Sequence, residues 1–271
     1  MADDCWKLAA FVIPDQGAIV FKKLKRLLGI TPKAAGENTY GTYLRGAPEE
    51  TWAQALERFS AFCLSLPAYY ENGETYEVYF DEYWRDGTLF EWLEPVADAD
   101  LLSAETQHGF AMPDALKALY RQRFAIYDVL AERGRWGERR VLEIYGRSPS
   151  TAYPCLHAFC PALAWNFGDY FAREELSAEQ IAHLNARYFC FGRWSDDDHS
   201  GTYLLVDRHG HFGRFDFHTE DYPGNVQRLE PLLHGQTLPM TLDALLVWAI
   251  NQSMEHLLHR NGLPNPHGKD A

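Results

Sequence analysis

The sequence predicts an α+β protein in which an antiparallel sheet is packed by helices. Short segments rich in aromatic and β-branched residues alternate with turn residues, and this pattern is typical of strands joined by tight connections. Other segments place apolar residues three and four positions apart behind capping residues, as amphipathic helices do. The 271 residues are 46% hydrophobic and 14% aromatic. Such a composition is that of a folded chain with a sizeable core.

Several elements are predicted in the first hundred residues. Apolar runs bounded by turn signals predict strands, and a run with helical spacing between prolines predicts a helix. The predicted strands are residues 5–13, 75–84 and 88–95, and the predicted helices are residues 15–28 and 48–64.

The rest of the chain shows stronger signals. Ser177 and Gln180 form a capping-box pattern, in which each side chain satisfies a backbone N–H of the other residue. Asp207 and Gly210 are the first and last residues of a predicted β-turn. The predicted helices are 112–134, 176–187 and 241–262, and the predicted three-stranded meander is 188–191, 202–206 and 212–217.

These elements suggest a division of the chain into regions. We expect a smaller N-terminal α/β region over residues 1–108 and an α+β domain over residues 109–262. Residues 263–271 are polar, rich in turn residues and terminal, so we expect a loose tail.

The charge balance excludes some classes of partner. The chain has 25 basic and 38 acidic residues, a formal net charge of −13. An acidic surface repels nucleic acid and anionic lipid and attracts a basic partner. The N-terminus lacks the basic segment of a signal peptide, and no apolar run is long enough to span a bilayer. We therefore expect a cytoplasmic protein that binds neither nucleic acid nor membrane.

The five cysteines show no functional spacing. They are Cys5, Cys63, Cys155, Cys160 and Cys190. The C-x4-C pair is neither a zinc knuckle nor a redox CxxC, so we expect buried thiols.

The run Asp-Asp-Asp-His at residues 196–199 raises the question of a metal site. Adjacent aspartates on a loop cannot all face one ion, and the sequence lacks HExxH, calcium-loop, Walker A, Rossmann and G-x-S-x-G patterns. We therefore expect a solvated acidic loop, no catalytic residue, no metal and no cofactor. The alternative is a metal-dependent hydrolase using the stretch 196–218, with Asp196, Asp198, His199 and His211 as ligands.

Acidic and aromatic residues are interleaved between residues 68 and 108, where Arg85 is the only base. Buried aromatic anchors beside charges are typical of protein interfaces. One group of predicted contact residues lies near a turn in this segment, and the other lies on the acidic loop. The predicted partner-binding residues are Asp81, Glu82, Trp84, Asp86, Trp194, Asp196, Asp197 and Asp198.

Three short motifs carry a resemblance to a known family. Residues 112–117 read Met-Pro-Asp-Ala-Leu-Lys, residues 188–192 end a strand in glycine, and residues 203–210 end in Asp-x-x-Gly. In this order they resemble the SUKH superfamily, although Ala-Glu-Arg-Gly at 131–134 stands where that family usually has Asn-Gly-Gly.

The resemblance implies a binding protein and not an enzyme. SUKH proteins commonly neutralise a toxin delivered by a competing cell, often a nuclease. We therefore expect a bacterial immunity protein that binds a basic cognate toxin. A scaffold that binds a partner other than a toxin is the remaining alternative.

Overall fold

The computed structural model describes residues 39–66, 89–132, 135–146, 160–161, 176–195, 200–218, 220–260 and 264–266. The sheet and the α-helices described below belong to one compact unit, Tyr40–Ser65 with Thr88–Ala271. The elements predicted over residues 5–13, 15–28 and 75–84 lie outside the described residues.

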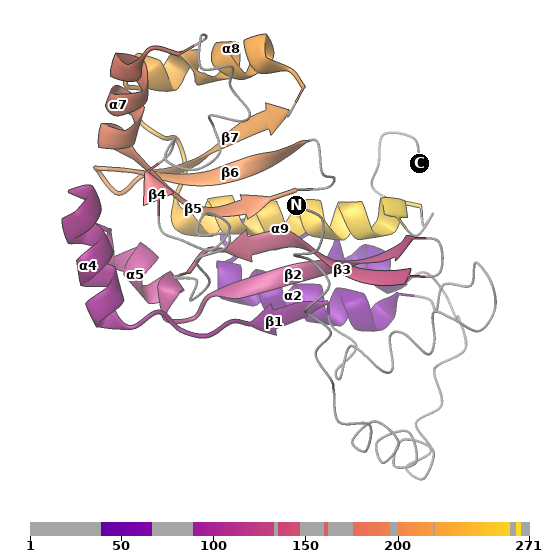
Figure 1. The fold of residues 1–271 in the computed structure, drawn as a ribbon. Coiled ribbons are helices and arrows are strands. Elements are labelled where there is room, and N and C mark those ends of the chain that lie inside the picture. The colour runs from indigo at the N-terminus through magenta and orange to yellow at the C-terminus, as the bar shows by residue number, and fades with distance from the viewer. Residues whose placement is uncertain are drawn as a thin grey trace, which may run out of the picture. The chain divides into compact units, whose positions relative to one another are not determined.

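One antiparallel sheet organises this unit (Figure 1). The strands follow the order β1-β2-β3-β5-β6-β7, and β4 pairs with β5 beside this path. Their bounds are β1 Phe90–Trp92, β2 Phe124–Glu132, β3 Arg135–Ile144, β4 Cys160–Pro161, β5 Tyr188–Trp194, β6 Ser200–Asp207 and β7 Phe212–His218. The pairing confirms the predicted α+β class and the predicted meander from residue 188 to residue 217.

Helices cover both faces of the sheet. Their bounds are η1 Thr39–Tyr43 (a 3-10 helix), α2 Trp52–Ser65, α4 Asp98–His108, α5 Asp114–Tyr120, α7 Ala178–Arg187, α8 Tyr222–Leu233 and α9 Leu242–Arg260. In the described part of the chain, no helix combines the length and the apolar character that crossing a bilayer requires.

Strand β7 shows how alternate residues are divided between the two faces. Phe215 and Phe217 join a buried cluster with Leu229 and Leu232 of α8. Arg214 points to the other face, where its guanidinium lies 4.1 Å from the ring centre of Trp248 in α9. The period of two along a strand therefore sends apolar residues toward α8 and a charged residue toward α9.

The prediction of one helix over residues 112–134 is wrong. Helix α5 ends at Tyr120, and β2 begins at Phe124. The alanines and leucines of this stretch favour a helix, but β2 lies between β1 and β3 and forms backbone ladders with both. Residues 124–127 are consequently buried on both faces of the sheet. Tertiary pairing outweighs helix propensity, which amounts to under about 1 kcal/mol per residue.

Helix α8 was not predicted from the sequence. Its prolines and glycine, Pro223, Gly224 and Pro231, resemble a loop. The Asp221 carboxylate caps the helix by accepting a hydrogen bond from the N–H of Gly224 at 3.1 Å. Proline is tolerated in the first turn, where a backbone N–H would have no helical partner.

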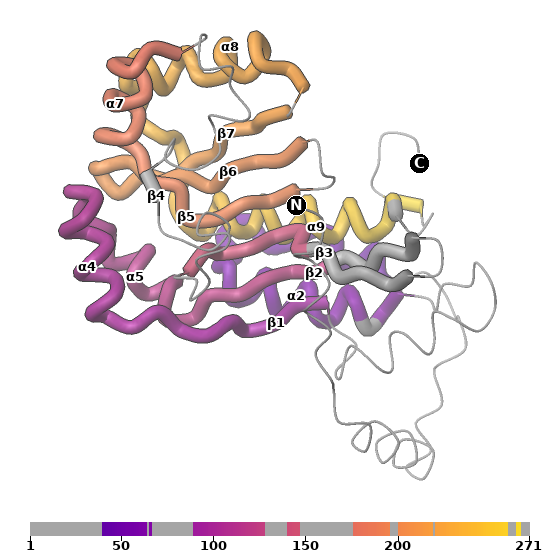
Figure 2. The backbone as a smooth tube through the Cα atoms, in the orientation of Figure 1, coloured from indigo at the N-terminus to yellow at the C-terminus, as the bar shows by residue number. Residues whose placement is uncertain are grey.

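The domain boundary predicted after residue 108 is not confirmed. Helix α2 contacts α9, and β1 pairs with β2, so elements from both sides of that boundary share one unit (Figure 2). Beyond α9, the Pro264 carbonyl accepts a hydrogen bond from the Tyr40 hydroxyl at 3.0 Å. The looseness of the tail stays a prediction.

Asp243 of α9 caps the beginning of α2, because its Oδ1 accepts a hydrogen bond from the Trp52 N–H at 2.9 Å. We expect Asp243→Ala to lower the free energy of unfolding by about 1 kcal/mol, the usual loss when a helix cap is removed. Asp243→Asn keeps an acceptor and should lose less. Urea denaturation of the three proteins measures this; equal stability of all three would contradict the capping role.

Cys63 and Cys190 are buried, which confirms the predicted buried thiols at these two positions. Burial raises the pKa of Cys63 to about 12. Because the thiolate is the reactive form, we expect N-ethylmaleimide at pH 8 to label Cys63 only after unfolding. Peptide mapping by mass spectrometry, with and without denaturant, checks this. Rapid labelling of Cys63 in the native protein would contradict it.

Candidate functional site

Seven of the eight predicted partner-binding residues lie outside the described residues: Asp81, Glu82, Trp84, Asp86, Asp196, Asp197 and Asp198. The eighth, Trp194, is partly buried at the end of β5. Its ring packs edge-on against Trp248 of α9, with 6.0 Å between ring centres. The structure therefore gives Trp194 a packing role on the α9 side of the sheet.

The register of β6 separates His211 from the acidic loop. The hydroxyl of Ser195 donates to the carbonyl of Ser200 at 2.7 Å, so the flanks of residues 196–199 are joined. From Ser200 to Asp207, β6 extends about 23 Å at roughly 3.3 Å per residue. His211 follows the turn at that far end. Asp196, Asp198 and His199, the other members of the predicted ligand set, lie outside the described residues, so that ligand set stays a prediction.

The described residues also lack a metal-binding cluster. Nowhere among them do three or more His, Cys, Asp or Glu side chains gather in a way that could hold an ion. His211 instead lies beside Asp207, with 3.4 Å between its Nδ1 and Oδ2 of the carboxylate.

The Asp207 carboxylate has a structural role at the turn between β6 and β7. Its Oδ1 accepts hydrogen bonds from the backbone N–H groups of His209 at 2.8 Å and His211 at 3.0 Å. Its Oδ2 accepts one from the N–H of Leu238 at 3.2 Å. The N–H of Gly210 donates to the Asp207 carbonyl at 3.1 Å, and Gly210 has φ of +81°, where glycine is favoured. The predicted turn is confirmed. The Asp207 side chain links the end of β6 to the turn, to the residue before β7 and to the segment at Leu238.

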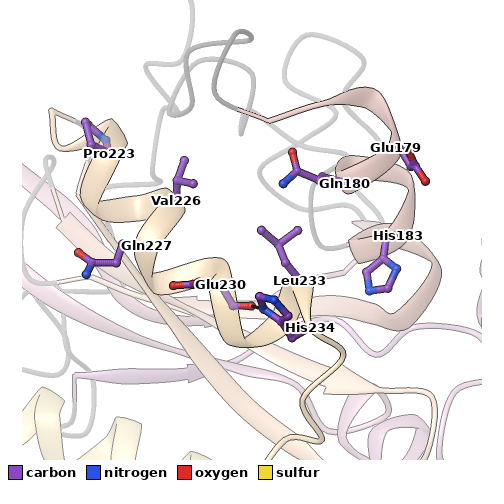
Figure 3. Close-up of a pocket in the computed structure, with 9 residues that line it drawn as sticks. All are labelled: Glu179, Gln180, His183, Pro223, Val226, Gln227, Glu230, Leu233 and His234. Atoms are coloured by element: carbon purple, nitrogen blue, oxygen red, sulfur yellow. Dashed lines mark hydrogen bonds between the residues drawn. The ribbon is translucent and has the colours of Figure 1, made fainter.

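A cleft of about 610 Å³ lies between α7 and α8 (Figure 3). It combines apolar side chains with carboxylates, amides and imidazoles. The lining residues are Glu179, Gln180, His183, Pro223, Val226, Gln227, Glu230, Leu233 and His234.

Local sequence signals fix the α7 wall of the cleft. The N–H of Gln180 donates to the Ser177 hydroxyl at 3.2 Å, and the Ser177 N–H donates to the Gln180 side-chain oxygen at 2.8 Å. This reciprocal pair is the predicted capping box. Leu184 faces inward and joins the buried cluster under the two helices. Helix α7 therefore starts at a defined residue with a defined face toward the sheet.

Buried polar contacts fix the α8 wall. Asn225 is 0% exposed, and its side chain forms two hydrogen bonds with the backbone of His218. The Nδ2 of Asn225 donates to the His218 carbonyl at 2.7 Å, and the His218 N–H donates to Oδ1 of Asn225 at 2.9 Å. At the other end, the Tyr188 hydroxyl donates to the Gln236 carbonyl at 2.7 Å. Burial raises the pKa of Tyr188, so the hydroxyl keeps the proton that it donates. Both ends of α8 are thus attached to the sheet.

The polar side chains of the cleft are carboxylates, amides and imidazoles, so the cleft offers both hydrogen-bond acceptors and donors. Among the described residues, none provides a hydrogen-bond partner for the buried Nε2 of His183. The Nδ1 of His234 lies 2.7 Å from the Glu230 carbonyl, and Nδ1 must donate there because a carbonyl only accepts. A neutral His234 ring consequently keeps Nε2 as an acceptor. Both glutamates are exposed. The Glu179 carboxylate points away from α8 (Figure 3), so Glu230 is the carboxylate on the α8 wall.

Sequence reasoning missed this cleft because it missed α8. His183 lies in a predicted helix, but no element was predicted opposite it, so its relation to Glu230 and His234 was hidden. The available signal was the Asp221-Tyr-Pro sequence, which combines a capping residue with proline in the first turn.

Comparisons with models of protein families, with curated proteins and with solved structures found no match to this chain.

Proposed function

We propose that this protein is a non-catalytic, cytoplasmic inhibitor that binds and neutralises a basic cognate toxin, with a nuclease as the expected toxin class. The observation that carries the proposal is the charge of the cleft between α7 and α8. Of the described residues that line it, none is a lysine or arginine, and the charged ones are Glu179 and Glu230. The chain as a whole has a net charge of −13.

The physical argument is electrostatic complementarity. A nuclease needs a basic groove to hold the phosphates of its substrate. An acidic protein is steered toward such a groove and can pair with its bases, which both speeds association and excludes the substrate. The same charge disfavours binding of nucleic acid or an anionic membrane by this chain.

The residues that carry the SUKH resemblance form structural contacts in this fold, and the family assignment on which the toxin expectation rests stays a prediction. Met112 precedes α5, and its N–H donates to Glu105 Oε1 of α4 at 2.7 Å. The Lys117 ammonium lies 2.8 Å from the same oxygen. Burial would raise the pKa of Glu105, but the bonds from Lys117 and Met112 outweigh burial and lower it. The motif 112–117 thus joins α4 to α5, while Asp207 of the Asp-x-x-Gly motif holds its turn.

Capture followed by a toxicity assay tests the proposal. A tagged chain is purified from its native organism, and the partner is identified by mass spectrometry. We expect a stoichiometric basic protein that stops growth when expressed alone and does not when this chain is expressed with it. Recovery of no partner, or of a partner without toxicity, would contradict the proposal and favour the scaffold alternative.

A further inference from the structure

We infer that the cleft between α7 and α8 receives an arginine side chain of the partner protein. This inference rests on the proposed function and adds the site and the chemical group that the site recognises. The cleft presents the Glu230 carboxylate and the Nε2 acceptor of a neutral His234 on α8, and it places the buried Nε2 of His183 on α7 beside them.

The acceptors favour a guanidinium over other groups. A guanidinium carries five N–H donors in a plane and no acceptor, so it can bond several acceptors that come from different directions. The Glu230 carboxylate supplies the opposite charge, and the Nε2 of His183 accepts a guanidinium N–H when the ring proton is on Nδ1. A carboxylate ligand would meet Glu230 and be repelled, because no lysine or arginine lies among the described lining residues.

The apolar lining suits the rest of an arginine side chain. Val226 and Leu233 are partly buried and pack on the core cluster beneath the helices. In Figure 3, both point from α8 toward the space between the helices. An arginine stem can lie along such apolar surface while its charged end reaches the polar groups.

The walls are held in place without a ligand. Helix α7 is fixed by its capping box, and α8 is fixed at its start by Asn225. A preformed site loses less entropy on binding, so even a single side chain should bind measurably.

NMR titration of the full chain with Nα-acetyl-arginine methylamide tests this inference. We expect saturable shifts, in the millimolar range of probe, at the imidazole signals of His183 and His234. The citrulline analogue has the same shape without the charge, and it should bind at least about fivefold more weakly because charged hydrogen bonds are roughly twice as strong as neutral ones.

Matched variants locate the binding. We expect Glu230→Gln to weaken binding of the arginine probe at least about fivefold, and His183→Gln to weaken it less, because its amide can replace one acceptor. Glu255→Gln, at an exposed position on α9, removes the same charge elsewhere and should leave binding unchanged. Spectra of each variant without probe show whether it is folded.

Three outcomes would overturn the inference. They are chemical shifts that do not saturate with the arginine probe, equal affinity for the arginine probe and the citrulline analogue, and equal loss of arginine-probe affinity in Glu230→Gln and Glu255→Gln. These outcomes leave the inhibitor proposal standing if capture still finds a toxin. If the capture experiment recovers no toxin but the arginine probe binds saturably, the inhibitor proposal alone is contradicted.

Discussion

Replacing Arg58 with alanine is expected to lower the free energy of unfolding by about 3–5 kcal/mol. The guanidinium of Arg58 bonds both oxygens of Glu50, at 2.8 and 2.7 Å. It also donates to the Tyr43 carbonyl at 2.6 Å and to the Asn251 side-chain oxygen at 2.7 Å. The two charged side chains are only 11% and 7% exposed. Removing Arg58 would leave the Glu50 carboxylate buried without a counter-charge.

This effect should be large because one side chain joins three elements. Arg58 lies on α2, Tyr43 on η1 and Asn251 on α9, so the guanidinium holds the first described helices against the last one. Figure 2 shows α2 and α9 lying side by side. The α2–α9 contact links residues separated by 193 positions in sequence, and the sheet alone does not provide that link.

A double-mutant cycle separates the ion pair from the other bonds. The free energy of unfolding is measured by guanidinium chloride denaturation for the unsubstituted protein, Arg58→Ala, Glu50→Gln and the double variant. We expect the double variant to be no less stable than Arg58→Ala, because it carries no uncompensated charge. Strictly additive losses would show that Arg58 acts through Tyr43 and Asn251 and not through Glu50.

Replacing Asp207 with asparagine is expected to lower the free energy of unfolding by about 2–3 kcal/mol. The carboxylate accepts three backbone N–H groups: those of His209 in the turn, His211 just after it and Leu238. An amide has one acceptor oxygen, so its NH2 group would face at least one donor and leave it unsatisfied. Loss of the negative charge also weakens the bonds that remain.

The same hairpin offers a matched control. Asp216 of β7 is 55% exposed, whereas the Asp207 side chain is 5% exposed. The Thr202 hydroxyl donates to Oδ1 of Asp216 at 2.7 Å, and asparagine keeps that acceptor. We expect Asp216→Asn to change stability by less than about 0.5 kcal/mol, as surface substitutions do. Similar losses in the two variants would contradict a special role for the buried carboxylate.

Some features of the fold were predictable because their causes are local. The α7 capping box needs only Ser177 and Gln180, three residues apart, and the β6–β7 turn needs only Asp207 and Gly210. The short turn also limits the register of the β6–β7 pair, in which Val206 lies opposite Phe212. In each case, the hydrogen bonds that define the structure join close neighbours in sequence.

The candidate site was not predictable because its causes are distant in sequence. The Asp221 cap at the start of α8 is local, but the end of the helix is held by the Tyr188 hydroxyl, which bonds Gln236 across 48 positions in sequence. The cleft exists only because α7 and α8 cover the same face of the sheet, which brings His183 near Glu230.

The sequence by itself determined the α+β class, the meander, the cap of α7 and the acidic character of the chain. Only the tertiary structure decided that residues 124–132 form a strand, that residues 222–233 form a helix and that a cleft lies between α7 and α8. The physical reason is the range of the deciding interaction. Capping and alternation act within a few residues, whereas β2 is a strand because β1 and β3 pair with both of its edges.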